Sequence, residues 1–291
     1  MKIIVLLISV LALASTEWID IDWSEVRPIE EFDQYWARLP AELQFLRNAF
    51  PNRRITNGQQ ATPGQFPYQV ALVITFSASS GLCGGSILTR NYILTAAHCV
   101  QNALGGTAIM GAHNRFVSEA TQQRIAFAAS GIKIHPGYIS TTIRNDIATV
   151  RLNNAMTLND RVVPARIPVT GDSRSFAGWT GTVSGFGRIS DTSTATSTVV
   201  MYTSNPIMSE NECAARWGSS LIQAQNICLS GDGGRSPCNG DSGGPLAVQD
   251  NGSLQVGIVS FGSASGCSIG MPSVFVRVSH FRDWIIANSD L

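Results

Sequence analysis

Ser242 is the residue of this chain with the clearest capacity for chemistry, and it lies in the glycine-rich segment 238–245 (CNGDSGGP). A serine hydroxyl is a weak nucleophile at neutral pH unless a base accepts its proton and nearby donors stabilise the oxyanion that forms. Glycine residues around Ser242 leave the backbone amides of Gly240 and Ser242 free to point at one carbonyl oxygen. The segment therefore predicts a nucleophile with an oxyanion hole, although alone it is also compatible with an ordinary glycine-rich turn.

Two other segments contain the partners that such a nucleophile needs. His98 lies in segment 95–99 (TAAHC), and Asp146 lies in segment 145–148 (NDIA). An imidazole can accept the serine proton and return it to a leaving amine. A buried, ionised carboxylate can hold the useful tautomer of that imidazole and stabilise the imidazolium.

Because the three motifs follow one another in the order His, Asp, Ser, the chain resembles the chymotrypsin-like serine proteases. The resemblance covers residues 55–291 and implies two six-stranded antiparallel β-barrels, divided near residues 165–180, with the active site in the cleft between them. It implies that His98, Asp146 and Ser242 are catalytic, that Gly240 and Ser242 form the oxyanion hole, and that proteins or peptides are the substrates. The leader segment 23–28 (WSEVRP) adds a resemblance to insect members of the chymotrypsin/brachyurin group.

Elements that could position these residues are visible from Tyr68 onward, where short β-rich runs alternate with turn residues, as in an all-β fold. The clearest predicted strands are 69–75, 86–88, 147–152, 181–185, 255–260 and 273–278. The sequence also predicts a tight hairpin at 250–252, a capping box at Ser209–Glu212 that opens a helix, and a last amphipathic helix over 280–288.

Composition limits the class of protein. The chain has 291 residues, of which 44% are apolar and 14% charged, with formal net charge zero. These values indicate a globular protein and give no sign of a nucleic-acid partner. We expect the protein to be a monomer. Residues 1–14 have a positive start, an apolar run and a small-x-small cleavage pattern, which predicts a signal peptide and secretion. We expect no association with a membrane, because the apolar run is too short to span one.

Six cysteines, none in a CxxC pair, are typical of disulfides in an oxidising compartment and not of a zinc site. The sequence alone allows fifteen connectivities. The resemblance implies the pairs Cys83–Cys99, Cys213–Cys228 and Cys238–Cys267. It also argues against a metal or other cofactor, because Ala112 stands where some trypsin-like relatives have the first calcium-binding acid.

Residues 15–54 form a distinct leader with eight acidic residues, five arginines and seven aromatic residues. Apolar side chains recur at helical spacing over 29–39 and again over 43–50, which predicts two short amphipathic helices. A leader so rich in aromatic residues favours docking on the protease body, and a loosely ordered spacer is the alternative. We interpret 15–54 as an activation propeptide.

The end of the leader predicts how the enzyme is activated. Arg54 precedes Ile55, and the resemblance implies cleavage between them by a protease of trypsin-like preference. The amine freed at Ile55 would then pair with the Asp241 carboxylate and order the loop around Gly240. Until that cleavage the chain would be a zymogen.

The resemblance assigns substrate contacts to Ser236, Ser260, Phe261, Gly262, Ser273 and Ile143. Ser236 takes the floor position where trypsin-like members carry an aspartate, so the pocket has no charge for arginine or lysine. Gly262 leaves the mouth open and Ser273 shortens the depth. Such a slot predicts cleavage after leucine, methionine, phenylalanine or tyrosine.

Several alternatives remain open from sequence. A regulatory cascade protease is one, although the leader lacks the cysteines of a clip module. A non-catalytic homologue that acts as a binding module is another, although all three triad residues are present. Asn251 lies in a sequon, and sequons are used in some proteins and unused in others. Protein protease inhibitors are further expected partners.

Overall fold

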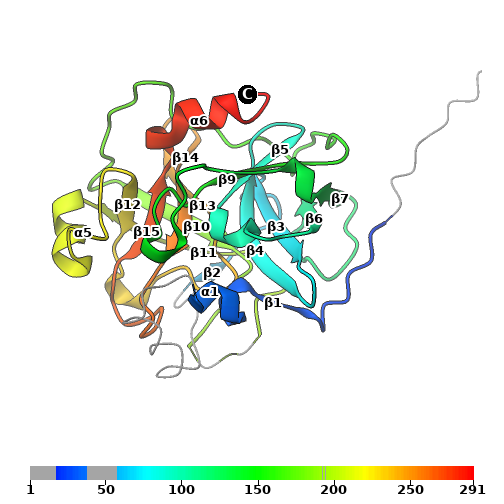
Figure 1. Cartoon of the computed structure of the whole chain (residues 1–291), viewed down its shortest axis with the longest axis horizontal. Helices are drawn as coiled ribbons and strands as arrows, with labels where there is room; N and C mark the ends of the chain where they lie inside the picture. Colours follow the sequence, from blue (N-terminus) through cyan, green and yellow to red (C-terminus); the bar gives the residue numbers. More distant parts are fainter. Residues whose placement is uncertain (1–17, 38–57, 192, 194) are drawn as a thin grey trace, which may run out of the picture.

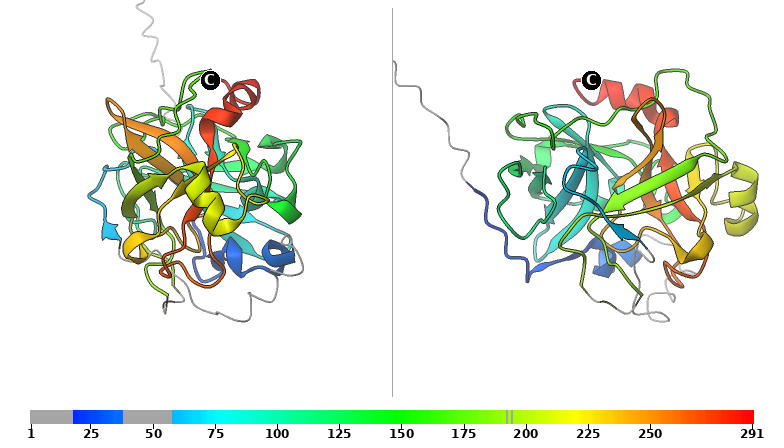
Figure 2. Two further views of the ribbon diagram at one scale, coloured as in Figure 1. Left: turned by 90° about the vertical axis from the view of Figure 1, so that its left-hand side faces the viewer. Right: turned by 180° about the vertical axis from the view of Figure 1, so that it is seen from behind.

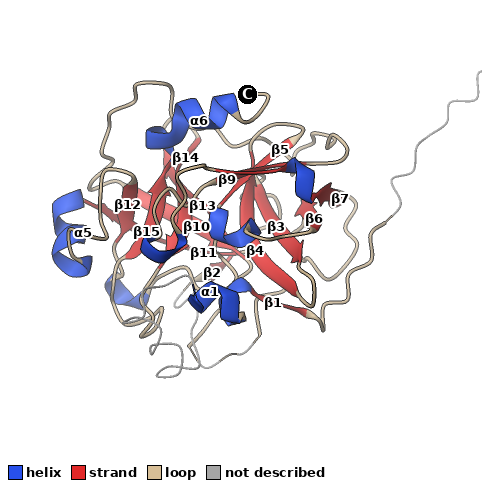
Figure 3. Cartoon of the chain, viewed as in Figure 1, coloured by secondary structure: helices blue, strands red, loops and turns tan. Residues whose placement is uncertain are grey.

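The computed structural model of the chain describes residues 18–37, 58–191, 193 and 195–291. Most of the ordered elements are short β-strands, and the helices are brief segments between them (Figure 3). No helix within these ranges has the length and apolar character needed to cross a membrane. The predicted signal peptide and the second predicted leader helix lie outside the described residues.

The first half of the body forms one antiparallel sheet, joined in the order β7-β6-β3-β4-β5-β9-β8. Its strands are β3 (Gln69–Thr75), β4 (Ser80–Ile87), β5 (Tyr92–Thr95), β6 (Gly105–Met110), β7 (Gln123–Ala128), β8 (Ile132–Ile134) and β9 (Ala148–Arg151). The two outermost strands, β7 and β8, follow each other in the chain and are separated only by the 3-10 turn Ala129–Gly131. The chain itself therefore closes the sheet into a barrel, with β7 and β8 acting as one bent strand.

The second half forms a closed ring of six antiparallel strands, because β10 pairs with both β13 and β11. The strands are β10 (Thr180–Gly185), β11 (Met201–Met208), β12 (Asn226–Leu229), β13 (Pro245–Gln249), β14 (Ser253–Phe261) and β15 (Ser273–Arg277). The short strand β2 (Gln59–Gln60), from the start of the body, adds to this ring at β11. The prediction of two six-stranded barrels is confirmed.

Helices occur where the sequence carries their signals. Helix α5 (Glu210–Trp217) begins at Ser209, whose side chain forms the predicted capping box with Glu212. The C-terminal helix prediction corresponds to a 3-10 turn, Val278–Phe281, followed by α6 (Arg282–Ala287). Helix α6 packs on the first barrel, since Phe281 and Ile285 belong to the same apolar cluster as β3, β5 and β9. Three further elements are α4 (Ala97–Val100) and the 3-10 turns Ser140–Thr142 and Asp232–Gly234.

The leader docks on the body, on the side opposite α6 in each view (Figures 1 and 2). Strand β1 (Val26–Pro28) pairs in parallel with β4, with Val26 opposite Ser80 and Pro28 opposite Leu82. The prediction of docking is therefore confirmed for residues 18–37. The prediction of one continuous helix over 29–39 was wrong. A 3-10 turn, Ile29–Glu31, comes first, and Phe32 separates it from α1 (Asp33–Ala37). Phe32 is extended, with ψ 143°, so the helical hydrogen-bond pattern cannot continue through it.

Candidate active site

His98 and Asp146 meet at one face of the first barrel. His98 lies on α4, directly after β5, and the Cys83–Cys99 disulfide ties this short helix to β4. The imidazole Nδ1 lies 2.7 Å from Asp146 Oδ2, and the His98 backbone amide donates to Asp146 Oδ1 over 2.9 Å. Both side chains are fully shielded from solvent. The carboxylate is thus held in a fixed position and can orient the ring.

Ser260 contributes to this pair in a way that the sequence did not reveal. The prediction placed Ser260 on the strand that follows the substrate backbone, and it does lie on β14. Its hydroxyl also donates to Asp146 Oδ2 over 2.6 Å. Ser260 therefore gives the Asp146 carboxylate a further hydrogen-bond donor in addition to the His98 backbone amide.

Ser242 sits in a tight turn of the second barrel, between β12 and β13. Gly240 has φ 95°, a conformation that glycine adopts without strain, and this directs its amide into the cleft. The loop is fixed from the other barrel, because the amide of Gly84 on β4 donates to the Ser242 carbonyl over 2.7 Å. A Cβ at Gly84 would lie 2.8 Å from Gly244 Cα. The loop therefore depends on bare backbone at the point where the barrels touch.

A leader residue that sequence reasoning missed occupies this site. Glu30 Oε1 accepts the Ser242 hydroxyl over 2.5 Å, and Glu30 Oε2 accepts the Gly240 amide over 3.0 Å. Burial raises the pKa of Glu30, and the bond from Ser242 partly opposes that rise. No pattern in the leader marks this residue, because its partners lie more than two hundred positions away in the chain.

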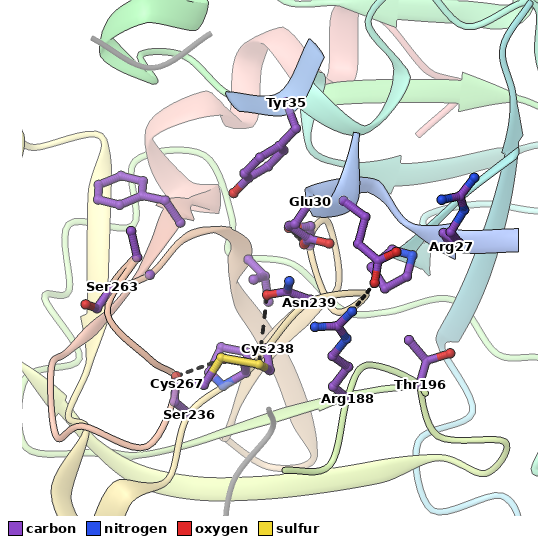
Figure 4. A pocket seen from close by; sticks show the side chains of 18 of the residues that line it. Arg27, Glu30, Tyr35, Arg188, Thr196, Ser236, Cys238, Asn239, Ser263 and Cys267 are labelled. Atoms are coloured by element: carbon purple, nitrogen blue, oxygen red, sulfur yellow. Dashed lines mark hydrogen bonds and ion pairs between the residues drawn. A yellow bond between two sulfur atoms is a disulfide. The ribbon is translucent and has the colours of Figure 1, made fainter. Parts of the chain in front are cut away.

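Four of the six residues predicted to contact substrate, Ile143, Ser236, Phe261 and Gly262, line one cavity of about 760 Å³, whereas Ser260 and Ser273 are buried beside it and do not line it. In Figure 4, Glu30 and Tyr35 of the leader face this cavity from one side, with Ser236 and Cys238 across from them. The hydroxyl groups of Ser236 and Ser273 lie 2.7 Å apart, and both side chains are buried. Among the described residues that line the cavity, the only acidic ones are Glu30 and Glu31 of the leader.

One part of the cavity wall is apolar. Phe261 packs edge-on against Trp217, with ring centroids 5.5 Å apart. Ile143 belongs to the same buried cluster and has φ 51°, an unusual value for a β-branched residue. Gly262 also lines the cavity, and a Cβ built there would meet no atom within 4 Å.

Asp241 directly precedes Ser242 and is fully buried. Its carboxylate accepts the amides of Gly187 and Cys238, over 2.8 and 2.9 Å. Burial is the main cause that raises the pKa of Asp241 to about 8, and the Glu30 carboxylate adds to the rise. Arg54 and Ile55, the other residues of the predicted activation site, lie outside the described residues.

This raised pKa makes the stability of the uncleaved chain dependent on pH. Unfolded Asp241 titrates near 3.8 and folded Asp241 near 8, so between these values unfolding releases a proton. The stability that Asp241 contributes to the folded chain is therefore fully present below about pH 4 and is lost as the pH rises through 8. In a chain kept uncleaved by Arg54→Gln, adding Asp241→Asn should flatten the fall of Tm between pH 5 and 8 by several degrees. Thermal unfolding followed by circular dichroism measures both slopes, and equal slopes would contradict the assignment.

The remaining predicted residues are placed as follows. Three disulfides join Cys83 to Cys99, Cys213 to Cys228, and Cys238 to Cys267. Asn251 is exposed in the turn between β13 and β14, with φ 48°, so a glycan there would meet no steric obstacle from the turn itself. Cys83, His98 and Cys99 bring potential metal-ligating atoms within 4.8 Å, but both sulfurs are in a disulfide and offer no thiolate.

Comparison with known proteins gives one consistent result. Residues 55–285 match the family model described as Trypsin. A chymotrypsin from Phaedon cochleariae is 41% identical over 241 residues, which cover 82% of this chain and 84% of that protein. A brachyurin from Leptuca pugilator is 40% identical over 79% of this chain and 96% of its own. The solved structure of HL collagenase superposes with a TM-score of 0.74 at 34% identity, over 81% of this chain and 99% of that one.

Proposed function

Because this chain belongs to the trypsin family and is a chymotrypsin-like serine endopeptidase, we propose that it is a secreted zymogen that cleaves after medium or large apolar residues. Digestion, or release in a secretion, is the role that we infer for it. The observation that carries the proposal is the contact between His98 Nδ1 and Asp146 Oδ2, next to the Ser242 loop.

The proposed reaction follows from the protons that these residues can hold. Ser242 attacks the scissile carbonyl while His98 takes the hydroxyl proton on Nε2. Asp146, bonded to Nδ1, stabilises the imidazolium that results. The amides of Gly240 and Ser242 stabilise the oxyanion, and His98 returns the proton to the leaving amine. Water then hydrolyses the acyl-enzyme by the same route.

Activation is proposed to require removal of the leader. In the uncleaved chain the Ser242 hydroxyl donates its one proton to Glu30, so it cannot donate the same proton to His98. Cleavage after Arg54 would free the amine of Ile55. This amine can then pair with the buried Asp241 carboxylate, and a buried carboxylate is strongly stabilised by a cationic partner. A trypsin-like protease is the activator that the arginine at this position favours.

The chemistry of the cavity supports the proposed preference for apolar residues. Ser236 and Ser273 bond to each other, and Phe261 and Trp217 form an apolar part of the wall. Burying an arginine or lysine without a counter-charge is unfavourable by several kcal/mol, whereas apolar side chains gain about 25 cal/mol for each Å² removed from water.

Peptides with leucine, methionine, phenylalanine or tyrosine before the scissile bond should therefore exceed arginine or lysine peptides at least about 100-fold in kcat/KM, a difference of roughly 2.7 kcal/mol. The measurement is hydrolysis of a matched peptide panel by the chain after activation with trypsin and removal of the trypsin. The variant Ser273→Gly deepens the slot and should shift the preference from leucine towards the aromatic residues. Equal rates for arginine and leucine peptides would show that a carboxylate reaches the pocket.

A further inference from the structure

The leader crosses the proposed active site and makes contacts that belong to a ligand. Its course starts at strand β1 on the first barrel, passes the Ser242 loop at Glu30, and reaches His98 at Tyr35. The Tyr35 ring meets the His98 ring edge-on, with centroids 5.5 Å apart. The nucleophile and the base are therefore both covered by the same short segment.

Glu30 occupies the reaction centre without offering a bond to cleave. Acyl transfer needs a carbonyl carbon that carries a leaving amine, and the Glu30 side chain presents a carboxyl group instead. One of its oxygens binds the Ser242 hydroxyl and the other binds the Gly240 amide. A carboxylate is a poor electrophile and carries no amine leaving group, so Ser242 forms no acyl bond with Glu30 and the segment remains bound as an inhibitor.

The residue before Glu30 in the chain anchors the leader to the body through apolar contacts. Ile29 is only 1% exposed and belongs to the core cluster of the first barrel. It fits over Gly81 of β4, where a Cβ would lie 3.1 Å from Ile29 Cδ1. Phe32 packs against the same cluster, with its ring 6.1 Å from that of Phe76. The leader thus fills a groove that the body leaves at this strand.

Polar contacts add a second anchor on each side of Glu30. Arg115 lies over the Trp23 ring at 4.3 Å, and Arg124 lies over the Trp18 ring at 4.0 Å. On the other side, Arg188 forms an ion pair with Glu31. Cations over aromatic faces and paired with carboxylates match the acidic, aromatic composition of the leader.

From these contacts we propose that residues 18–37 are an active-site ligand that inhibits the protease both before cleavage and, as a released peptide, afterwards, with Glu30 as the group that binds the catalytic site. The inference rests on the proposed function, since it takes Ser242 as the nucleophile. None of these contacts involves the Arg54–Ile55 peptide bond. Cleavage of that bond therefore allows the leader to dissociate but leaves its binding contacts intact.

The test uses the protein after activation by trypsin and removal of both the trypsin and the released leader, with a synthetic peptide of residues 18–37 added during hydrolysis of an apolar peptide substrate. The natural peptide should raise the apparent KM and leave kcat unchanged. A Glu30→Ala peptide should inhibit at least about tenfold more weakly, equivalent to roughly 1.4 kcal/mol. A Glu25→Ala peptide is the matched control, because Glu25 is exposed, and it should inhibit within about twofold of the natural peptide.

The possible results distinguish a failure of the proposed function from a failure of this inference. No hydrolysis before peptide is added would overturn the proposed function. Normal hydrolysis without inhibition would overturn the present inference, as would equal inhibition by the natural and Glu30→Ala peptides or a mode that is not competitive. Mass spectrometry should find the natural peptide intact after the assay, and its cleavage would make it a substrate and contradict the proposal.

Discussion

Substitution of Arg54 by glutamine should leave the chain uncleaved by trypsin at the junction with Ile55 and lower kcat/KM at least about 10²–10³-fold, the loss expected when even one oxyanion donor is removed. Two physical reasons combine in this expectation. Glu30 stays on Ser242 and on the Gly240 amide, and the Asp241 carboxylate gains no amine to pair with. N-terminal sequencing and a peptide-hydrolysis assay on the same sample measure both steps.

The matched control is Arg53→Gln, which removes a neighbouring cation and leaves Arg54 available to the activating protease. This variant should be cleaved before Ile55 and should hydrolyse substrate like the natural chain. Cleavage of the Arg54→Gln chain after Arg53 would leave an extra residue before Ile55, so activity should stay low. Full activity from an uncleaved Arg54→Gln chain would rule out this mechanism of activation.

Substitution of Ser242 by alanine should abolish peptide hydrolysis in the trypsin-treated chain. In serine proteases with this set of residues, loss of the nucleophile lowers kcat by about 10⁶-fold, and we expect a loss of that order. The proposed mechanism forms its covalent bond at the Ser242 hydroxyl, which alanine lacks. Active-site titration and a sensitive peptide assay measure the residual rate.

Folding must be checked separately, because Ser242 is buried at the contact between the barrels. The Ser242→Ala chain should be cleaved normally before Ile55 and should unfold within a few degrees of the natural chain. Ser253→Ala, which removes a hydroxyl on the distant hairpin strand β14, should keep its activity. Comparable turnover by purified Ser242→Ala enzyme would show that the nucleophile is misassigned.

The strands that the sequence predicted best are those with β-branched residues in continuous runs. Strand β3 begins and ends at the predicted residues, 69 and 75. Strand β4 begins at Ser80, six residues before the predicted start at 86, and the added stretch contains three glycines. Intrinsic preference is weak there, and pairing with β3 on one side and the leader on the other stabilises the extension. Such pairing is not visible in local sequence.

The leader shows the same limit more clearly. Apolar spacing over 29–39 predicted one helix, and it did identify Ile29 as a residue that packs against the body. It could not reveal that residues 26–28 form a strand, because that strand exists only through its partner on β4. Nor could it reveal a buried Glu30, since glutamate is almost never fully buried without a partner that sequence spacing does not disclose.

The candidate site was predictable to the extent that short motifs encode it. Segments 95–99, 145–148 and 238–245 identified three residues, and the structure brings His98 and Asp146 into contact. The bond from Ser260 to Asp146 joins residues 114 positions apart, and the cover over Ser242 comes from 212 positions away. Both depend on the folded arrangement of the barrels, so neither has a local signature.

The contact of Gly84 with the Ser242 loop has a consequence for how such proteins can diverge. Position 84 belongs to the first barrel, yet the space available to it is set by Gly244 of the second barrel. Any side chain there would push the nucleophile loop away from His98 or separate the two halves. The barrels can therefore accumulate substitutions independently over most of their surfaces but not here, where the backbone of the second barrel requires glycine at position 84 of the first. A recombinant that exchanges one barrel with a relative therefore needs glycine at this position from whichever parent supplies the first barrel.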